Sequence, residues 1–363
     1  MANRSRLFRA AGALGAGALI ALTLTIAPSA AASTASASAD PGIVSTTAQL
    51  SPDVAATVKA PGADARNKAL ASYWTADRMK SALPDSELPS VKAMAAAKPA
   101  AAAPTQASGA PTRIAAADAT ATPKPANPAN SAGGDAVTPN AYYPNYPVGS
   151  PPARTAGKVF FTSFGLNYVC SGTIVNTEGK STVWTAGHCV SDGGAWNTNW
   201  IFVPNYANSS APYGYWYSSA LWTTTAWLNN NNDYANDVGA SIMSRNNGSR
   251  ITDYLGGQGI TWNAGIGAYM YAFGYPQAAP FTGCCLVAEQ GYTYDGGGGT
   301  IYMANAMTGG SSGGSWLASF DGNWGYINGH NDFKYNASPQ YMYSPYYGNQ
   351  VASLYNSVRN LST

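Results

Sequence analysis

Two histidines occur in the 363-residue chain, and one of them, His188, stands in the sequence TAGHC beside a cysteine. Imidazole is the commonest general base in proteins because its pKa lies near neutrality. A glycine-rich stretch, MTGGSSGGSW (residues 307–316), holds a pair of serines. Glycine lets the backbone form a tight turn, and such a turn can aim successive N–H groups at one point. If Ser312 is the nucleophile, the N–H groups of Gly310 and Ser312 are the natural donors to an oxyanion.

A third group must be an acid, because a serine hydroxyl needs a base and the base needs a carboxylate that orients it. We favour Asp237, since it directly precedes the apolar run VGASIM and its side chain can point inward from the start of that strand. Asp233 is the rival candidate. The order His188, Asp237, Ser312 has intervals of 49 and 75 residues. Six acidic residues lie between His188 and Ser312: Asp192, Asp233, Asp237, Asp253, Glu289 and Asp295.

Other site chemistries fit the sequence less well. Residues 310–314 match the G-x-S-x-G pattern of α/β-hydrolases, but there the acid and the histidine follow the serine. Here only His330 follows, and the helices of an α/β sheet are missing. Two histidines far apart argue against a catalytic zinc site, which normally has three protein ligands. The run DGGGGT lacks the lysine and helix of a phosphate-binding loop. We therefore expect no cofactor and no metal in the site, while a structural calcium held by backbone oxygens and scattered aspartates stays open.

The elements that must position these residues are strands. From about residue 155, short apolar runs such as KVFFTSF and GAYMYAFGY alternate with turn residues, which predicts an all-β fold. The length suits two packed antiparallel barrels, at about 155–250 and 258–348. The final segment spaces its apolar residues as a helix does, which predicts a helix at about 349–360. These apolar residues are Val351, Leu354, Tyr355 and Val358.

The first 140 residues differ in character. Three arginines, an uncharged stretch and a small-residue cleavage pattern predict a signal peptide over residues 1–32. Residues 33–140 are predicted to be a partly disordered pro-region with an Ala/Pro-rich linker, which leaves residues 141–363 as the functional domain. We expect a secreted, extracellular protein that is processed between about 130 and 157.

Composition excludes several partners. Residues 155–363 carry 6 Lys and Arg against 9 Asp and Glu, so no basic surface for nucleic acid is expected. We expect a monomer that leaves the membrane once the signal is removed.

Export permits disulfides, and four cysteines (Cys170, Cys189, Cys284 and Cys285) allow three pairings.

TAGHC, with CSGTIV before it, NDVGASI next and GGSSGGS last, resembles the chymotrypsin-like (trypsin-like) serine peptidases. Within that superfamily the sequence looks most like the bacterial secreted branch of glutamyl endopeptidases, to which YAFGYPQ (271–277) is also similar. The resemblance covers roughly residues 155–363 and implies two packed six-stranded Greek-key barrels with the site between them. It implies a serine endopeptidase that cleaves polypeptides through an acyl-enzyme on Ser312. His188 would be the general base and Asp237 the orienting acid.

The resemblance also pairs Cys170 with Cys189, which leaves Cys284 and Cys285 as a vicinal disulfide or as two thiols.

One departure from the family concerns activation. Animal-type members keep an aspartate before the nucleophile that pairs with the new N-terminus, whereas here Ser311 stands there. A zymogen of this chain must therefore use its pro-region otherwise, by blocking the cleft or by assisting folding.

A second departure concerns the specificity pocket. Ala306 stands where basic-specific members keep an aspartate, and Met307 where acid-specific members keep a hydroxyl. Asn328 lies near the position of their histidine. With Gly329 and His330 these residues are the candidate pocket, and they match neither familiar specificity. Two other functions stay open: an esterase with the same triad, and a catalytically degenerate extracellular β protein that binds polysaccharide or protein.

Overall fold

Strands dominate the computed structural model, which describes residues 42–98, 102–121, 123, 149–230 and 232–363. The predicted signal peptide lies outside the described residues, as do residues 99–101, 122 and 124–140 of the predicted pro-region and its linker. No helix in the described ranges is long and apolar enough to cross a membrane.

The first half of the predicted domain is a closed antiparallel barrel. Its strands pair in the order β10-β11-β6-β5-β4-β9, and β9 pairs back onto β10 to close the ring. Every residue of β4 and β11 is buried, because both faces of these strands are covered. The barrel that the sequence predicted here is confirmed. The six strands are β4 (Ala156–Ser163), β5 (Leu166–Ile174), β6 (Thr182–Thr185), β9 (Thr198–Pro204), β10 (Trp216–Thr224) and β11 (Gly239–Met243).

The second half consists of two sheets. The larger has the order β14-β13-β17-β18-β12-β3, and the smaller has the order β15-β16-β19. These pairings differ from the closed six-stranded barrel that the resemblance implied, because the described strands of the two sheets do not pair into one ring. The strands are β12 (Gly259–Trp262), β13 (Tyr269–Gly274), β14 (Val287–Tyr292), β15 (Tyr294–Gly297), β16 (Thr300–Ala304), β17 (Ser315–Ala318), β18 (Tyr326–His330) and β19 (Tyr341–Pro345).

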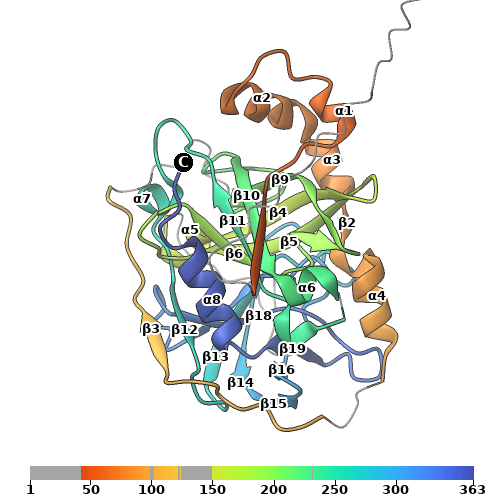
Figure 1. The fold of residues 1–363 in the computed structure, drawn as a ribbon, viewed down its shortest axis with the longest axis vertical. Coiled ribbons are helices and arrows are strands. Elements are labelled where there is room, and N and C mark those ends of the chain that lie inside the picture. Colours follow the sequence, from red (N-terminus) through yellow and green to blue (C-terminus); the bar gives the residue numbers. More distant parts are fainter. Residues whose placement is uncertain (1–41, 99–101, 122, 124–148, 231) are drawn as a thin grey trace, which may run out of the picture. The chain divides into compact units, whose positions relative to one another are not determined.

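The predicted C-terminal helix is confirmed as α8 (Asn349–Val358). It lies against β10, β11 and β12 (Figure 1) and so spans both halves. All four residues of its predicted apolar face are buried. Short elements complete this part of the chain: α5 (Pro151–Thr155), β7 (Ser191–Asp192), β8 (Ala195–Trp196), α6 (Thr225–Asn229), η2 (Tyr234–Asn236) and α7 (Ile251–Leu255).

Residues 42–98, here called the N-terminal segment, are folded, although the sequence predicted a partly disordered pro-region over residues 33–140. Its first strand pairs antiparallel with β10 and so widens the barrel sheet. Trp74 is buried, packs on Phe160 and donates its indole N–H to the carbonyl of Asn199 (2.7 Å). Packing against the barrel thus stabilises helices that have little amphipathic pattern of their own. The elements are β1 (Ile43–Thr47), α1 (Pro52–Ala55), α2 (Ala63–Tyr73), α3 (Ala76–Ser81), β2 (Leu83–Pro84), η1 (Asp85–Glu87) and α4 (Pro89–Ala96).

Part of the predicted linker is also ordered. The strand β3 (Thr112–Ile114) adds an edge to the larger sheet of the second half by pairing antiparallel with β12. Thr105 donates its hydroxyl to the carbonyl of Thr300 (3.0 Å). Backbone pairing to an open sheet edge needs few apolar side chains, so an Ala/Pro/Thr-rich sequence can supply it.

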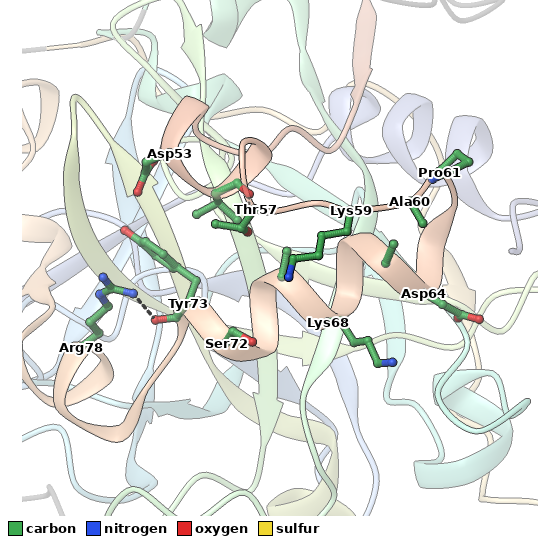
Figure 2. Close-up of a pocket in the computed structure, with 13 residues that line it drawn as sticks. Asp53, Thr57, Lys59, Ala60, Pro61, Asp64, Lys68, Ser72, Tyr73 and Arg78 are labelled. Atoms are coloured by element: carbon green, nitrogen blue, oxygen red, sulfur yellow. Dashed lines mark hydrogen bonds between the residues drawn. The ribbon is translucent and has the colours of Figure 1, made fainter.

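The N-terminal segment contains a hollow of about 910 Å³ (Figure 2). Its walls come from α1, α2 and the loop between them, with Arg78 at one end. The guanidinium of Arg78 donates to the carbonyl of Tyr73 (2.8 Å). None of the predicted site residues lines this hollow.

Candidate active site

His188 and Asp237 meet at the ends of two paired strands. His188 follows β6 and Asp237 precedes β11, and the pairing of Thr185 with Gly239 brings these ends together. The Nδ1 atom of His188 lies 2.8 Å from Oδ2 of Asp237. The backbone N–H of His188 donates to Oδ1 of the same carboxylate (2.8 Å). Two contacts therefore fix the imidazole relative to the acid.

The glycine of TAGHC has a steric reason. A Cβ atom on Gly187 would lie 2.7 Å from Oδ1 of Asp237 and 2.7 Å from the ring of Trp227. Both neighbours are fully buried. The carboxylate can therefore approach the histidine backbone only because residue 187 has no side chain.

Three of the other acidic candidates are engaged in contacts away from His188. The carboxylate of Asp233 accepts from the side-chain amide of Asn236 (3.0 Å). Asp253 pairs with Arg250, and Asp295 accepts from the backbone N–H of Gly297. Of the two residues that the sequence put forward, the structure brings Asp237 and not Asp233 to His188.

Ser312 lies in the turn before β17, against the first barrel. Its carbonyl accepts from the backbone N–H of Ser171 in β5 (2.7 Å). Gly313 has φ +79°, and a Cβ atom there would lie 2.1 Å from the hydroxyl of Thr185. A glycine is thus required next to the serine, both for the backbone conformation and for the close approach of the two halves.

A disulfide joins β5 to the histidine loop. Cys170 and Cys189 are bonded with an S–S distance of 2.03 Å, which confirms the predicted pairing. Cys284 and Cys285 are bonded to each other, as the vicinal alternative has it. The first bridge fixes the residue next to His188 to a central strand of the barrel.

An acid that the sequence analysis missed, Asp85 of the N-terminal segment, occupies the site. The hydroxyl of Ser312 donates to Oδ2 of Asp85 (2.5 Å), and the same oxygen lies 3.3 Å from Nε2 of His188. The backbone N–H of Gly310 donates to Oδ1 of Asp85. One carboxylate oxygen therefore separates the base from the hydroxyl. The role of the Ser312 N–H as a second donor stays a prediction.

A second missed acid, Asp332, lies on the Nδ1 side of the imidazole, as Asp237 does, and opposite Asp85. Its Oδ1 atom is 3.4 Å from Nδ1 of His188, and its carbonyl accepts from the hydroxyl of Ser312 (3.2 Å). Burial and the charge of Asp237 hold the pKa of Asp332 well above its usual value. Asp332 is therefore the carboxyl that keeps its proton, as expected when two acids share one site.

The imidazole lies in a strongly charged, dry environment. Burial alone would lower the pKa of His188, but the charge of Asp237 and contacts with three carboxyl groups raise it well above its usual value. Burial alone would raise the pKa of Asp237. The charge of the neighbouring His188 and its hydrogen bond outweigh burial, so the pKa of Asp237 lies below its usual value. The pair is thus stabilised as imidazolium and carboxylate while Asp85 is present.

The structure does not bring all the candidate pocket residues to Ser312. Met307 is fully buried in the core of the second half. Asn328 lines a hollow with Arg113 and Tyr326, which none of the three candidate triad residues lines. His330 is buried, with its Nδ1 atom 2.8 Å from the hydroxyl of Tyr347, and burial lowers its pKa to about 3.

The fourth and fifth pocket candidates differ in their surroundings. Gly329 packs against the ring of Trp316. Ala306 donates its backbone N–H to the carboxyl group of Glu289 (2.7 Å). Burial disfavours the charged form of this carboxyl group and raises the pKa of Glu289 to about 7. Next to it, the ammonium of Lys334 donates to the carbonyls of Asn305 and Pro339. Sequence reasoning did not place this buried acid and this half-buried base beside Ala306.

The solved structures that are similar to the chain include two bacterial or extremophile proteases. The protease Anisep from Arthrobacter nicotinovorans is 40% identical, with 58% of this chain and 98% of that one covered and a TM-score of 0.55. The thermostable serine protease AL20 from an extremophilic microorganism is 33% identical, with 57% and 97% covered and a TM-score of 0.55. No protein-family model and no curated protein matches the sequence. The chain belongs to the chymotrypsin-like serine proteases.

Proposed function

We propose that the protein is a secreted serine endopeptidase that uses His188, Asp237 and Ser312 as its catalytic triad. One observation carries this proposal. The imidazole that Asp237 holds on one side approaches, on its other side, the very oxygen to which Ser312 donates its hydroxyl. A general base, an orienting acid and a nucleophile must converge on one point in this way.

The reaction would proceed by acyl transfer. Nε2 of His188 takes the hydroxyl proton as Oγ of Ser312 attacks the carbonyl carbon of the substrate. The resulting oxyanion is held by the N–H of Gly310, which already donates to an anionic oxygen of Asp85, and by the N–H of Ser312. His188 then gives its proton to the leaving amine, and water releases the acyl group by the reverse route. Asp237 keeps Nδ1 protonated throughout.

The proposed precursor has a signal peptide over residues 1–32 and a pro-region over residues 33–140. The N-terminal segment then belongs to the pro-region, and the peptidase domain is residues 141–363. We further propose that the two sheets of the second half are the two walls of a second barrel. The extensive packing of the described pro-region residues on the barrel supports the view that it folds with the domain.

Labelling with a fluorophosphonate tests the nucleophile, because the probe reacts only with an activated hydroxyl. The processed protein should be labelled at Ser312, and the Ser312→Ala variant should be neither labelled nor active on peptides. Ser311→Ala is the matched control, since its hydroxyl donates to the carbonyl of Thr308 and not to the site. Full peptide hydrolysis by a clean Ser312→Ala preparation would remove Ser312 from the mechanism. Parallel assays with ester and peptide substrates separate an esterase from an endopeptidase.

A further inference from the structure

Residues 82–96 cross the candidate active site and are bound on both sides of it. Before the site, the carbonyl of Ala82 accepts from the side-chain amide of Gln277, and β2 pairs in parallel with Tyr168 and Val169 of β5. Beyond the site, the hydroxyl of Tyr234 donates to the carbonyl of Ser90 (3.0 Å). These contacts hold the crossing residues in one register over the site.

Apolar side chains anchor the segment after it has crossed. Leu88 is fully buried and Val91 is 6% exposed, and both belong to the same core cluster as residues of the first barrel. Met94 packs against a cluster that contains Trp227, Tyr234 and Phe333. Burial of this kind is what makes a segment bind tightly rather than touch in passing.

Between these anchors, Asp85 presents a side chain to the nucleophile and not a peptide bond. The carbonyl of Asp85 accepts from the backbone N–H of Leu88 (2.8 Å), so the 3₁₀ turn η1 uses it. The carboxylate of Asp85 faces Ser312, and the residue is only 1% exposed. A carboxylate is what peptide hydrolysis produces, and its carbon is a poor electrophile, so Ser312 cannot form an acyl-enzyme with it.

The carboxylate also occupies the places that a reaction needs. One oxygen accepts from the Gly310 N–H, where the oxyanion would form. The other accepts the Ser312 proton that His188 would have to remove. We propose that residues 82–96 are an autoinhibitory segment and that Asp85 binds in the active site as a mimic of a product carboxylate. This proposal rests on the proposed function, and it names the contact by which the pro-region blocks catalysis.

Labelling of the intact full-length chain tests the proposal. The variants are Asp85→Ala and Asp85→Asn, which keeps the side-chain shape without the charge. Glu87→Gln is the matched control, because Glu87 pairs with Lys92 at the surface, where the two side chains are 45% and 56% exposed. The rate of fluorophosphonate reaction at Ser312 is measured by intact mass, which also shows that the chain is uncut.

We expect Asp85→Ala to be labelled on the order of a hundredfold faster than the wild type, because it loses two charge-assisted hydrogen bonds, each worth about tenfold or more. Asp85→Asn should lie between them, and Glu87→Gln should match the wild type. Wild-type labelling as fast as Asp85→Ala would overturn the proposal and leave the proposed function standing. So would variants that stay unlabelled until the N-terminal segment is cut away. No labelling of any form, cut or uncut, would overturn both.

Discussion

Substitution of Gly187 by alanine tests how tightly the triad depends on its backbone. The added methyl group would start 2.7 Å from Oδ1 of Asp237 and 2.7 Å from Cδ1 of Trp227, closer than real Cβ contacts. The backbone of Gly187 does not have a positive φ, so alanine causes no backbone strain there. The effect is therefore a collision alone, and the question is which neighbour moves.

Trp227 is fully buried and its indole N–H donates to the carbonyl of Ser191 (3.0 Å), so the ring has little room. We expect the Asp237 carboxylate to shift instead and to weaken both of its bonds to His188. A misplacement of about 1 Å near a reacting centre lowers the rate by about 10²-fold. Full loss of the acid's function lowers it by about 10⁴-fold. Overpacking should also cost about 1–3 kcal/mol of unfolding free energy.

The assay compares kcat/KM on a peptide substrate with the thermal midpoint of the same preparation. Gly187→Ala should fall 10²- to 10⁴-fold in kcat/KM while it remains folded. Gly265→Ala is the control, because a Cβ atom there meets nothing within 4 Å. A Gly187→Ala enzyme within tenfold of the wild type would show that the carboxylate tolerates displacement, and the reasoning from the short contact would be wrong.

Two further predictions concern the buried acids. Asp237→Asn should lower kcat/KM by about 10⁴-fold. Asp332→Asn should keep kcat/KM within about tenfold of the wild type, because a protonated carboxyl group and a carboxamide are alike in shape and charge. Equal losses in the two variants would contradict the assignment of Asp237 as the ionised acid and Asp332 as the protonated one. Burial raises the pKa of Glu289 from 4.5 to about 7, so the folded state binds more protons than the unfolded state between these values. Unfolding free energy should therefore fall as pH rises from 4.5 to 7, by up to about 3 kcal/mol. Denaturant titrations at several pH values should show that the unfolding free energy of Glu289→Gln depends less on pH than that of the wild type. The same pH dependence in both proteins would refute the assignment of this effect to Glu289.

Local patterns were sufficient to predict the elements that carry the site. His188, Asp237 and Ser312 each stand beside a short apolar strand, and strand ends are where a β protein can gather polar side chains. The helix α8 was predictable because its apolar spacing is regular over ten residues. The pairing of Cys170 with Cys189 followed from the family resemblance alone.

Long-range contacts were beyond the sequence. Asp85 lies 227 residues before Ser312, and nothing local marks it as a site residue. Asp332 had a weak signal, since it follows the apolar strand β18 as Asp237 precedes β11. His330, two residues earlier, was a pocket candidate because it lies close to Asn328, yet its side chain is buried against Tyr347. Alternation along a strand would put residues 330 and 332 on the same face, so it does not distinguish them, and the rarity of a residue type does not say what its side chain contacts.

The way Asp85 is held bears on how inhibition can end. The donors that bind its carboxylate, the Gly310 N–H and the Ser312 hydroxyl, are the donors that catalysis needs. A change that weakened them would release the segment and disable the enzyme together. Release must therefore come from the parts of the segment that the reaction does not use. These are the buried anchors Leu88 and Val91 and the backbone contacts of β2 and α4. A cut in the chain between the segment and the barrel would make their binding bimolecular, so the segment would be held by its own affinity alone and would dissociate on dilution.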